Sequence, residues 1–389
     1  MQKKIGKILF LTIDFPPMPG GMARHSLDVA RALTGIGRAL TVVAPDCGAM
    51  PGSPQPSGML IERIRGLEPE KIFCSYARSC AAFFFKGLKF VLARKAGLLF
   101  VNTWSVAGVA AFALKKLFGV RYIVFVHGFD VSSPQKNRKT MALMRLVLGN
   151  AAYVIANSGF TKKLIENIVK QENAAVIYPI VELSRFDQKG ASLKKKLGNK
   201  EVILTVARLV ESKGHESVIR AMFRVRAYFP ECKYVIVGEG PLEPVLRALV
   251  KELGLENTVI FEKGVTDELL PAYYEACDIF VLTSREIPQR GEIEGFGIVF
   301  LEAAASAKAA IAGRTGGVPE AVIDGQTGLL VDPLDIEGIA GCIVRLLQDE
   351  KARQIMGNKA RERVAKELTL ERMQGQLQRI IDDVLAEPV

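Results

Sequence analysis

Histidine is scarce in this chain, and its cysteines lack the spacing that metal sites need. The 389 residues include three His, at positions 25, 127 and 215, and six Cys, at positions 47, 74, 80, 232, 277 and 342. No Cys-x-x-Cys pair occurs, so we expect no structural zinc site. Scattered cysteines fit a reducing compartment, and we therefore expect a cytoplasmic protein.

No segment has the pattern of a secretory signal or of a membrane-spanning helix. Residues 1–10 run directly into a strand-like pattern, without a separate apolar core and cleavage site. The uncharged stretch 96–114 is almost long enough to span a bilayer. It divides, however, into a strand at 98–102 and a helix at 106–116, so we expect it to belong to a folded domain.

Acidic residues are few in the first half of the chain. Residues 1–190 hold 26 basic and 11 acidic side chains, whereas residues 191–389 hold 26 and 30, and the whole chain has a net charge of +11. This asymmetry suggests that only the first half meets an anionic partner, such as a lipid surface or a phosphorylated acceptor. The alternative is that these Lys and Arg side chains are solvated surface residues without a partner. Nucleic acid is poorly supported, because the basic residues follow no recognised module.

Short apolar runs alternate with amphipathic helical stretches along the chain. The runs occupy residues 7–13, 40–44, 98–102, 122–126 and 153–156, and then 202–206, 234–237, 279–282 and 309–312. Near-continuous runs of Val, Ile, Leu and Phe are typical of strands covered on both faces. The alternation therefore predicts an α/β fold with a parallel sheet in each half.

The alternation is interrupted at residues 178–199, where we place the linker. We expect an N-terminal domain at 1–182, a second domain at 183–367, and a final helix at 368–389 that packs back on the first domain. Two such doubly wound domains would direct the carboxyl ends of their strands at a central cleft, where ligands bind.

Polar and glycine motifs follow several of the predicted strands. Gly20 and Gly21 stand between a strand and a helix, where backbone N–H groups can approach a phosphate, although a plain turn explains them as well. His127 follows the strand 122–126 and begins His-Gly-Phe-Asp; a structural histidine is the alternative. Arg208 and Lys213 follow the strand 202–206, and two cations there can neutralise a diphosphate or serve as surface ion-pair residues.

The clearest motif is the stretch 294–302. Glu294 and Glu302 flank a Gly-Phe-Gly turn, and a helix is expected to start near Ile298. Glu294 would then lie in a loop and Glu302 just over one turn inside the helix. One carboxylate can bind sugar hydroxyls and the other ribose hydroxyls. A second glycine-rich turn, at residues 314–320, should line the same cleft or make no ligand contact.

Taken in order, these motifs resemble those of the family 4 retaining glycosyltransferases, also called group 1, which have the GT-B fold of two Rossmann-like domains. The resemblance includes Gly238–Glu–Gly–Pro241, covers nearly the whole chain and is strongest at residues 202–333. Residues 290–302 look like members that mannosylate phosphatidylinositol lipids. The implied activity is sugar transfer from a nucleotide-diphosphate sugar, GDP-mannose or a UDP-sugar, to an acceptor hydroxyl on a lipid-linked or cell-envelope glycan.

The resemblance also implies a role for each motif. His127 would bond the transferred sugar, Arg208 and Lys213 would hold the phosphates, and Glu294 would bind sugar hydroxyls. The donor-binding residues would be Gly20, Gly21, Gly238, Phe296, Gly297, Ile298, Val299 and Glu302, with Glu302 on the ribose. The acceptor residues stay unassigned. The basic segment 78–95, with Phe83, Phe84, Phe85 and Phe90, would be the membrane-facing helix of lipid-modifying members, unless these rings pack in the core.

Departures and rivals remain. Family members often have Pro-Asn-Gly-Val-Asp at the linker, whereas this chain reads Tyr-Pro-Ile-Val-Glu-Leu at 178–183. No Asp-x-Asp sequence occurs, so neither a metal nor another cofactor is expected, and the two cations would supply the charge. A sugar-nucleotide epimerase on the same fold is an alternative. A nicotinamide-dependent dehydrogenase is less favoured, because the stretch at Gly238 lacks the third glycine of the dinucleotide fingerprint.

Overall fold

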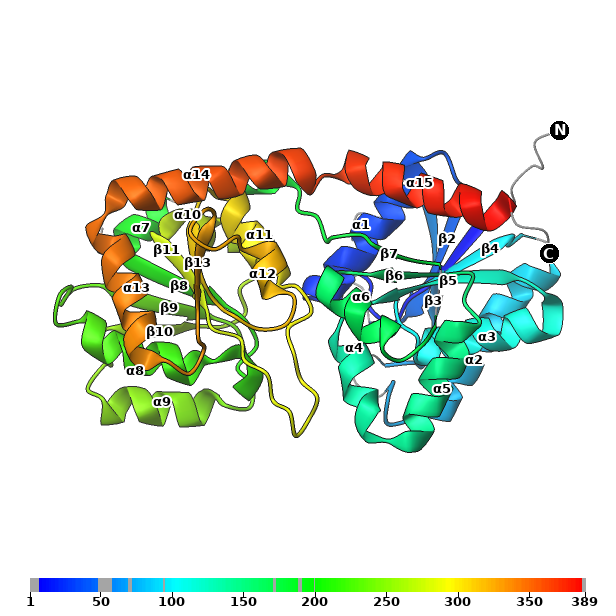
Figure 1. The fold of residues 1–389 in the computed structure, drawn as a ribbon, viewed down its shortest axis with the longest axis horizontal. Helices are drawn as coiled ribbons and strands as arrows, with labels where there is room; N and C mark the ends of the chain where they lie inside the picture. Colours follow the sequence, from blue (N-terminus) through cyan, green and yellow to red (C-terminus); the bar gives the residue numbers. More distant parts are fainter. Residues whose placement is uncertain are drawn as a thin grey trace. The chain divides into compact units, whose positions relative to one another are not determined.

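The computed structural model describes residues 7–47, 58–68, 72–93, 95–170, 173–187, 191–198 and 200–386. The chain divides into two compact units, Met1–Pro179 with Leu370–Val389, and Ile180–Thr369. Each unit is built on one parallel β-sheet with helices on both faces (Figure 1). The predicted fold class, α/β with two Rossmann-like domains, is therefore confirmed.

The first unit holds a seven-stranded sheet in the order β3-β2-β1-β4-β5-β6-β7. Its strands are β1 (Ile8–Leu11), β2 (Leu40–Pro45), β3 (Met59–Ile64), β4 (Leu98–Val101), β5 (Arg121–Val126), β6 (Tyr153–Ala156) and β7 (Ala174–Val176). Its helices are α1 (Gly21–Gly35), α2 (Tyr76–Leu92), α3 (Val106–Phe118), α4 (Phe129–Ser132), α5 (Arg138–Gly149), α6 (Gly159–Glu166) and α15 (Leu370–Ala386). A 3₁₀ turn, η2 (Ser133–Lys136), follows α4.

The strands of this sheet alternate their side chains between two apolar layers. Leu9 and Leu11 of β1 join one core cluster with Phe83 of α2 and Ala110 of α3. On the opposite face, α1 packs against α15, where Arg38 lies 3.4 Å from Asp382. The C-terminal helix is thus part of the first unit, and it is fixed along α1.

The second unit holds a six-stranded sheet in the order β10-β9-β8-β11-β12-β13. The strands are β8 (Val202–Val206), β9 (Lys233–Val237), β10 (Val259–Glu262), β11 (Ile279–Leu282), β12 (Ala309–Gly313) and β13 (Gly328–Val331). The helices are α7 (Ala191–Lys196), α8 (His215–Val225), α9 (Glu243–Glu252), α10 (Leu270–Ala276), α11 (Ile298–Ala305), α12 (Val318–Ala321), α13 (Ile336–Gln348) and α14 (Glu350–Glu367). Two 3₁₀ turns are η3 (Leu183–Phe186) and η4 (Glu211–Lys213).

Two local features follow from these elements. Lys213 ends the turn η4, and Gly214 in a left-handed conformation separates it from α8. The uncharged stretch 96–114 forms β4 and most of α3. Among the described residues, no helix combines the length and the apolar content needed to cross a membrane.

The phenylalanines of α2 divide between core and surface. Phe83 and Phe90 are buried, whereas Phe85 is 66% exposed. The alternative that these rings pack in the core therefore holds for Phe83 and Phe90, holds in part for Phe84, and fails for Phe85. Only one side of α2 packs against the sheet. A ring on the outer side of this helix therefore has no apolar layer to enter.

Candidate active site

Two predicted site residues of the second unit form an ion pair. Lys213 Nζ lies 2.5 Å from Glu294 Oε2, and the hydroxyl of Ser284 donates to the same carboxylate oxygen at 3.0 Å. The side chains of Lys213 and Glu294 are 22% and 15% exposed. The pair is therefore largely desolvated, but a ligand can still reach it.

The charge of Glu294 is held by its neighbours. Burial by itself raises the pKa of this carboxyl, but Lys213, the Ser284 hydroxyl and the charge of Arg208 outweigh burial, and the pKa falls below its usual value. Glu294 is thus ionised at neutral pH. An ammonium has three donors and a carboxylate has two acceptor oxygens, so both groups keep capacity for a ligand.

The glycine-rich turn after β12 fixes the backbone of Glu294. Gly317 N donates to Glu294 O at 2.9 Å. Gly316 has φ +52°, and a Cβ there would lie 2.1 Å from the same oxygen. Only glycine allows this approach, so the segment 314–320 supports Glu294 through main-chain contact.

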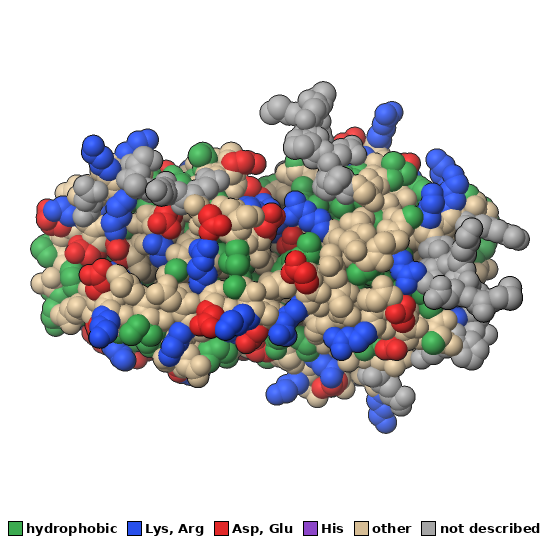
Figure 2. All heavy atoms as spheres, turned by 90° about the horizontal axis from the view of Figure 1, so that it is seen from above, with side chains coloured by type: hydrophobic (Ala, Val, Ile, Leu, Met, Phe, Trp, Pro, Cys, Tyr) green, Lys and Arg blue, Asp and Glu red, His purple; other side chains and the backbone are tan. Residues whose placement is uncertain are grey.

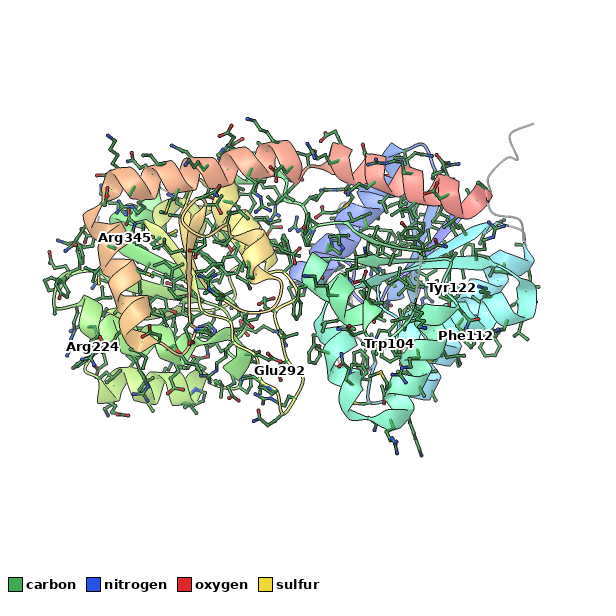
Figure 3. The ribbon with its side chains drawn as sticks, viewed as in Figure 1. Trp104, Phe112, Tyr122, Arg224, Glu292 and Arg345 are labelled. Carbon is green, nitrogen blue, oxygen red and sulfur yellow. The ribbon has the colours of Figure 1, made fainter. Side chains whose placement is uncertain are left out.

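The loop between β11 and α11 is also tied to the turn η4. It contains a β-bridge between Ile287 and Glu292, the latter labelled in Figure 3. Arg290 Nη2 lies 2.6 Å from Glu211 Oε2, and Arg285 Nη2 lies 3.5 Å from Glu211 Oε1. Glu211 and Lys213 belong to one turn, so η4 holds both the beginning and the end of this loop.

Arg208 stands two residues after β8 with its side chain exposed. Its carbonyl is 3.0 Å from His215 Nε2. A carbonyl only accepts, so this nitrogen carries the proton. Burial lowers the pKa of His215 to about 4. His215 is therefore a neutral donor that supports the backbone of Arg208, a role that the sequence did not indicate.

Gly238 allows two loops to touch. It has φ +149°, and a Cβ there would lie 2.0 Å from Ala207 O. Ala207 N in turn donates to Val237 O at 3.1 Å. The turn after β9 thus packs directly on the turn after β8 that carries Arg208, and this packing requires glycine.

The stretch 296–302 forms the start of α11. Gly297, with φ +91°, precedes the helix, which begins at Ile298 as predicted. The first N–H groups of a helix have no partners within it, so the amides around Ile298 and Val299 form an anion-favouring end. Phe296 is buried. Glu302 is also buried, and its Oε2 accepts a hydrogen bond from Tyr274 OH at 2.7 Å.

In the first unit, Gly20 and Gly21 form the start of α1. Gly20 has φ +109° and is the N-cap, with no neighbouring atom within 4 Å of a Cβ added there. Glycine is thus required by the backbone angle and leaves the helix end open. Both glycines are exposed. Such an end is suited to an anion.

His127 follows β5 and is anchored on both sides. Its backbone N donates to Asp130 Oδ1 at 2.8 Å, and its ring Nε2 lies 3.0 Å from Asn102 O. Burial lowers the pKa of His127 to about 4, although the bond to Asn102 acts in the opposite direction. Burial raises the pKa of Asp130 to about 7. The indole of Trp104, labelled in Figure 3, donates to Asp130 O at 2.5 Å.

The predicted residues therefore gather in two groups, at the carboxyl ends of the strands of each unit. The second unit brings together Arg208, Lys213, Gly238, Glu294, Phe296, Gly297, Ile298, Val299 and Glu302, and the first unit brings together Gly20, Gly21 and His127.

Three residues that contact the predicted ones were not predicted: Ser284, Tyr274 and Asn102. Of these, only Ser284 could have been found from the sequence, because it stands just after β11, where site residues are expected. In the described part of the chain, no three His, Cys, Asp or Glu side chains cluster as metal ligands would.

Two relatives share the name GDP-mannose-dependent alpha-(1-6)-phosphatidylinositol monomannoside mannosyltransferase. The one from Mycolicibacterium smegmatis is 33% identical over 244 residues, covering 61% of this chain and 63% of the relative, so this match spans less than two thirds of that protein. The one from Mycobacterium tuberculosis is 28% identical over 370 residues, covering 92% and 93%.

Solved structures show the same fold. Sucrose-phosphate synthase from Thermosynechococcus elongatus superposes with a TM-score of 0.82 at 24% identity, covering 98% of this chain and 99% of the other. Anabaena HepE, solved with UDP and glucose, gives a TM-score of 0.80 at 22% identity, covering 97% and 99%.

Each half of the chain matches a family model. Residues 19–185 match the model for Glycosyltransferase Family 4, and residues 188–363 match the model for Glycosyl transferases group 1. The two matches leave only residues 186–187 between them, and they take in every residue of the two groups described above. This chain belongs to the family 4 glycosyltransferases, with the two Rossmann-like domains of the GT-B fold.

Proposed function

We propose that the protein is a retaining hexosyltransferase that uses a nucleotide-diphosphate sugar, GDP-mannose or a UDP-sugar. The observation that carries this proposal is the Lys213–Glu294 pair, which lies in the field of Arg208. A site that combines two cations with one ionised carboxylate suits a ligand that has both phosphates and hydroxyls. The names of the two mannosyltransferase relatives favour GDP-mannose among the donors.

In this proposal each group of the second unit has one task. Arg208 and Lys213 bind the diphosphate, and the N-terminal amides of α11 complete its pocket. The Glu294 oxygen that does not face Lys213 accepts hydroxyls of the sugar. Glu302, held by Tyr274, accepts hydroxyls of the ribose. Gly238 keeps the loops close, and in the first unit Gly20 and Gly21 approach the diphosphate while His127 bonds the transferred sugar.

The proposed reaction retains the configuration of the sugar. The bond between C1 and the phosphate oxygen breaks, and a bond between C1 and the acceptor oxygen forms on the same face. The departing phosphate takes the proton of the acceptor hydroxyl, so charge and atoms balance without a protein nucleophile. Arg208 and Lys213 stabilise the negative charge that develops on the diphosphate.

We propose that this charge stabilisation needs no metal ion, because two side-chain cations are available for the diphosphate. Turnover that is unchanged by EDTA is the expected result. Activity that EDTA abolishes while the protein stays folded, and that a divalent cation restores, would overturn this part of the proposal.

For the acceptor, we propose an anionic or lipid-linked molecule at the cytoplasmic face of a membrane. A groove of about 760 Å³ lies between β3 and α2. Its cationic lining consists of Arg63, Arg65, Lys86 and Lys89, and its one acidic residue, Glu62, is 2.6 Å from Lys86. Phe85 stands exposed in the same lining. Each Lys or Arg near an anionic bilayer contributes about 1 kcal/mol of attraction.

Basic side chains do not dominate every part of the surface. Figure 2 shows one face, on which basic and acidic side chains are interspersed. Lys86 and Lys89 line the basic groove. A double variant, Lys86→Glu with Lys89→Glu, should therefore lose binding to anionic vesicles. A matched pair on α14, Lys351→Glu with Lys359→Glu, should keep it. Equal binding of both double variants, or no binding by the native chain at low salt, would contradict the membrane proposal.

The donor is tested by a thermal-shift panel of UDP, GDP, ADP and their sugars, with NAD as a further ligand. We expect the diphosphate that binds most tightly to raise the Tm most, because stabilisation grows with the logarithm of ligand concentration over Kd, and Arg208→Ala to abolish the rise. No shift with any of them would refute a nucleotide-sugar site. An NAD-dependent shift would favour a dehydrogenase instead.

A further inference from the structure

His25 lies against the ring of His127. The two ring centroids are 5.2 Å apart with planes at 84°, and His25 makes a similar edge contact with Phe125, at 5.8 Å and 78°. His25 is 2% exposed. Its ring therefore fills the space between β5 and α1, and it limits how the ring of His127 can turn.

Ser26, the residue that follows His25, supports His127 through Asn102. Asn102 Nδ2 lies 3.2 Å from Ser26 Oγ, and Ile13 N donates to Asn102 Oδ1 at 3.3 Å. The backbone oxygen of the same Asn102 faces the His127 ring. Two successive residues of α1, His25 and Ser26, thus support one imidazole, directly and through Asn102.

The bond to Asn102 also selects the tautomer of His127. A carbonyl oxygen only accepts, so His127 Nε2 carries the proton at 3.0 Å from Asn102 O. In the neutral ring, Nδ1 then has a lone pair. This nitrogen makes no hydrogen bond to any residue that the structure describes, and the side chain is half-buried. Nδ1 is therefore an acceptor for a ligand hydroxyl.

The ring nitrogens of His25 do not hold His127 through a hydrogen bond. Both Nδ1 and Nε2 are buried without a hydrogen-bond partner among the described residues. The part of His25 that acts on its surroundings is the flat ring. Its place is one helical turn after Gly21, at the open end of α1.

We propose that His25 is a positioning residue, whose ring holds the neutral Nε2–H form of His127 with Nδ1 directed at a substrate hydroxyl. This inference rests on the proposed sugar transfer. It adds a physical connection between the start of α1, which carries Gly20 and Gly21, and the histidine that meets the sugar. His25 itself touches neither substrate.

Two variants separate the ring from its nitrogens. His25→Phe keeps a flat ring of similar size, and His25→Ala removes it. We expect His25→Ala to lower kcat about tenfold to a hundredfold, with a change in the donor KM of less than about threefold, since small misplacement of a reacting group has effects of this size. His25→Phe should restore kcat to within about threefold of the native value.

A core variant controls for lost stability. Met144 of α5 is fully buried in the same unit and contacts neither histidine in the described contacts. Met144→Ala should lower the Tm as His25→Ala does, but leave kcat unchanged. If Met144→Ala lowers kcat equally, the effect of His25→Ala is general destabilisation, and the proposal is wrong.

Nitrogen NMR of histidine-labelled protein reads the tautomer directly. The chain has three histidines, so each signal can be assigned with one variant. We expect the Nε2–H pattern for His127 in native protein and in His25→Phe, and averaged nitrogen signals in His25→Ala. An unchanged His127 pattern in His25→Ala would overturn the proposal, and so would a loss of kcat in His25→Phe as large as in His25→Ala.

The NMR experiment needs no donor or acceptor. If no sugar transfer is found with any donor, the proposed function fails, but the effect of His25 on His127 is still measured. If transfer is found and the NMR patterns do not respond to His25→Ala, only the present inference fails.

Discussion

Lys213 and Glu294 are 81 positions apart in the chain, yet their charged atoms lie 2.5 Å from each other. The sequence motifs had suggested separate tasks for them, phosphates for Lys213 and hydroxyls for Glu294. The ion pair joins these tasks, because each side chain keeps the other charged and in place. Loss of either should therefore impair both proposed contacts.

Replacement of Glu294 by Gln tests this dependence. Glu294→Gln keeps the shape of the side chain but leaves Lys213 and Arg208 without a carboxylate. We expect turnover to fall about a hundredfold, which corresponds to about 3 kcal/mol of transition-state stabilisation. Steady-state kinetics measure the effect. Glu216→Gln, which breaks an exposed pair with Arg220 at 3.0 Å, should leave turnover unchanged. Equal losses in the two variants would contradict the role of the ion pair.

Glycine at position 316 is required for the backbone of Glu294. In Gly316→Ala the new Cβ would meet Glu294 O at 2.1 Å, so the loop must move. We expect a loss of at least about 2 kcal/mol in the free energy of unfolding together with most of the activity. Gly325 has φ +69° and no atom within 4 Å of a Cβ. Gly325→Ala should cost about 1 kcal/mol and keep full activity. Chemical denaturation measures the free energy of unfolding of both variants, and an activity assay measures their turnover. Equal losses in the two variants would contradict a specific role of Gly316.

Tyr274→Phe should weaken donor binding through Glu302. The phenol donates to Glu302 Oε2 at 2.7 Å, and without it the buried carboxylate loses a donor and its fixed position. We expect the donor KM to rise about tenfold, or about 1.4 kcal/mol, along with a lower Tm. The matched variant Tyr122→Phe removes a buried hydroxyl that donates to Val147 O in the first unit. A rise in KM in that variant too would show that the effect is not specific to Glu302.

The pH dependence of stability should change when His25 is replaced. Burial, followed by the nearby His127, lowers the pKa of His25 to about 3 in the folded protein. In the unfolded chain the pKa of a histidine is about 6.5, so below this pH the unfolded state takes up a proton that the folded state does not. His25 therefore costs stability as the pH falls from about 6.5 towards 3.

His25→Phe lacks this penalty. Its free energy of unfolding, relative to the native protein, should increase by about 2 kcal/mol between pH 7.5 and pH 5. Asp130, whose pKa is raised by burial, acts equally in both proteins and cancels in the difference. Urea denaturation at the two pH values measures it. A difference that is independent of pH would mean that His25 titrates normally in the folded state.

The central strands and the site motifs could be predicted from the sequence because both follow local rules. Buried parallel strands such as β5 and β11 are continuous apolar runs, and the motif residues come directly after them. The start of α11 at Ile298 was predicted from the Gly-Phe-Gly turn. Edge strands were missed, because β3 contains Glu62 and Arg63 and is only half-buried, and β7 is three residues long.

Contacts between distant segments could not be predicted in this way. His25 lies in an ordinary amphipathic helix pattern, and nothing near it in sequence indicates that it meets His127. Tyr274 and Glu302 belong to different helices that are brought together only by the packing of α10 on α11. These relationships depend on the strand order and on the helix packing, which the local pattern does not contain.

The proposed reaction is tested most directly by the anomeric configuration of its product. The donor that gives the largest thermal shift is supplied with ¹³C at C1, and the one-bond C1–H1 coupling of the product is measured by NMR for the native protein and for Arg208→Ala. We predict an α-linked product from an α-linked donor, and a rate at least about a hundredfold lower in Arg208→Ala. An inverted product, or near-normal turnover in Arg208→Ala, would contradict retaining transfer assisted by this cation.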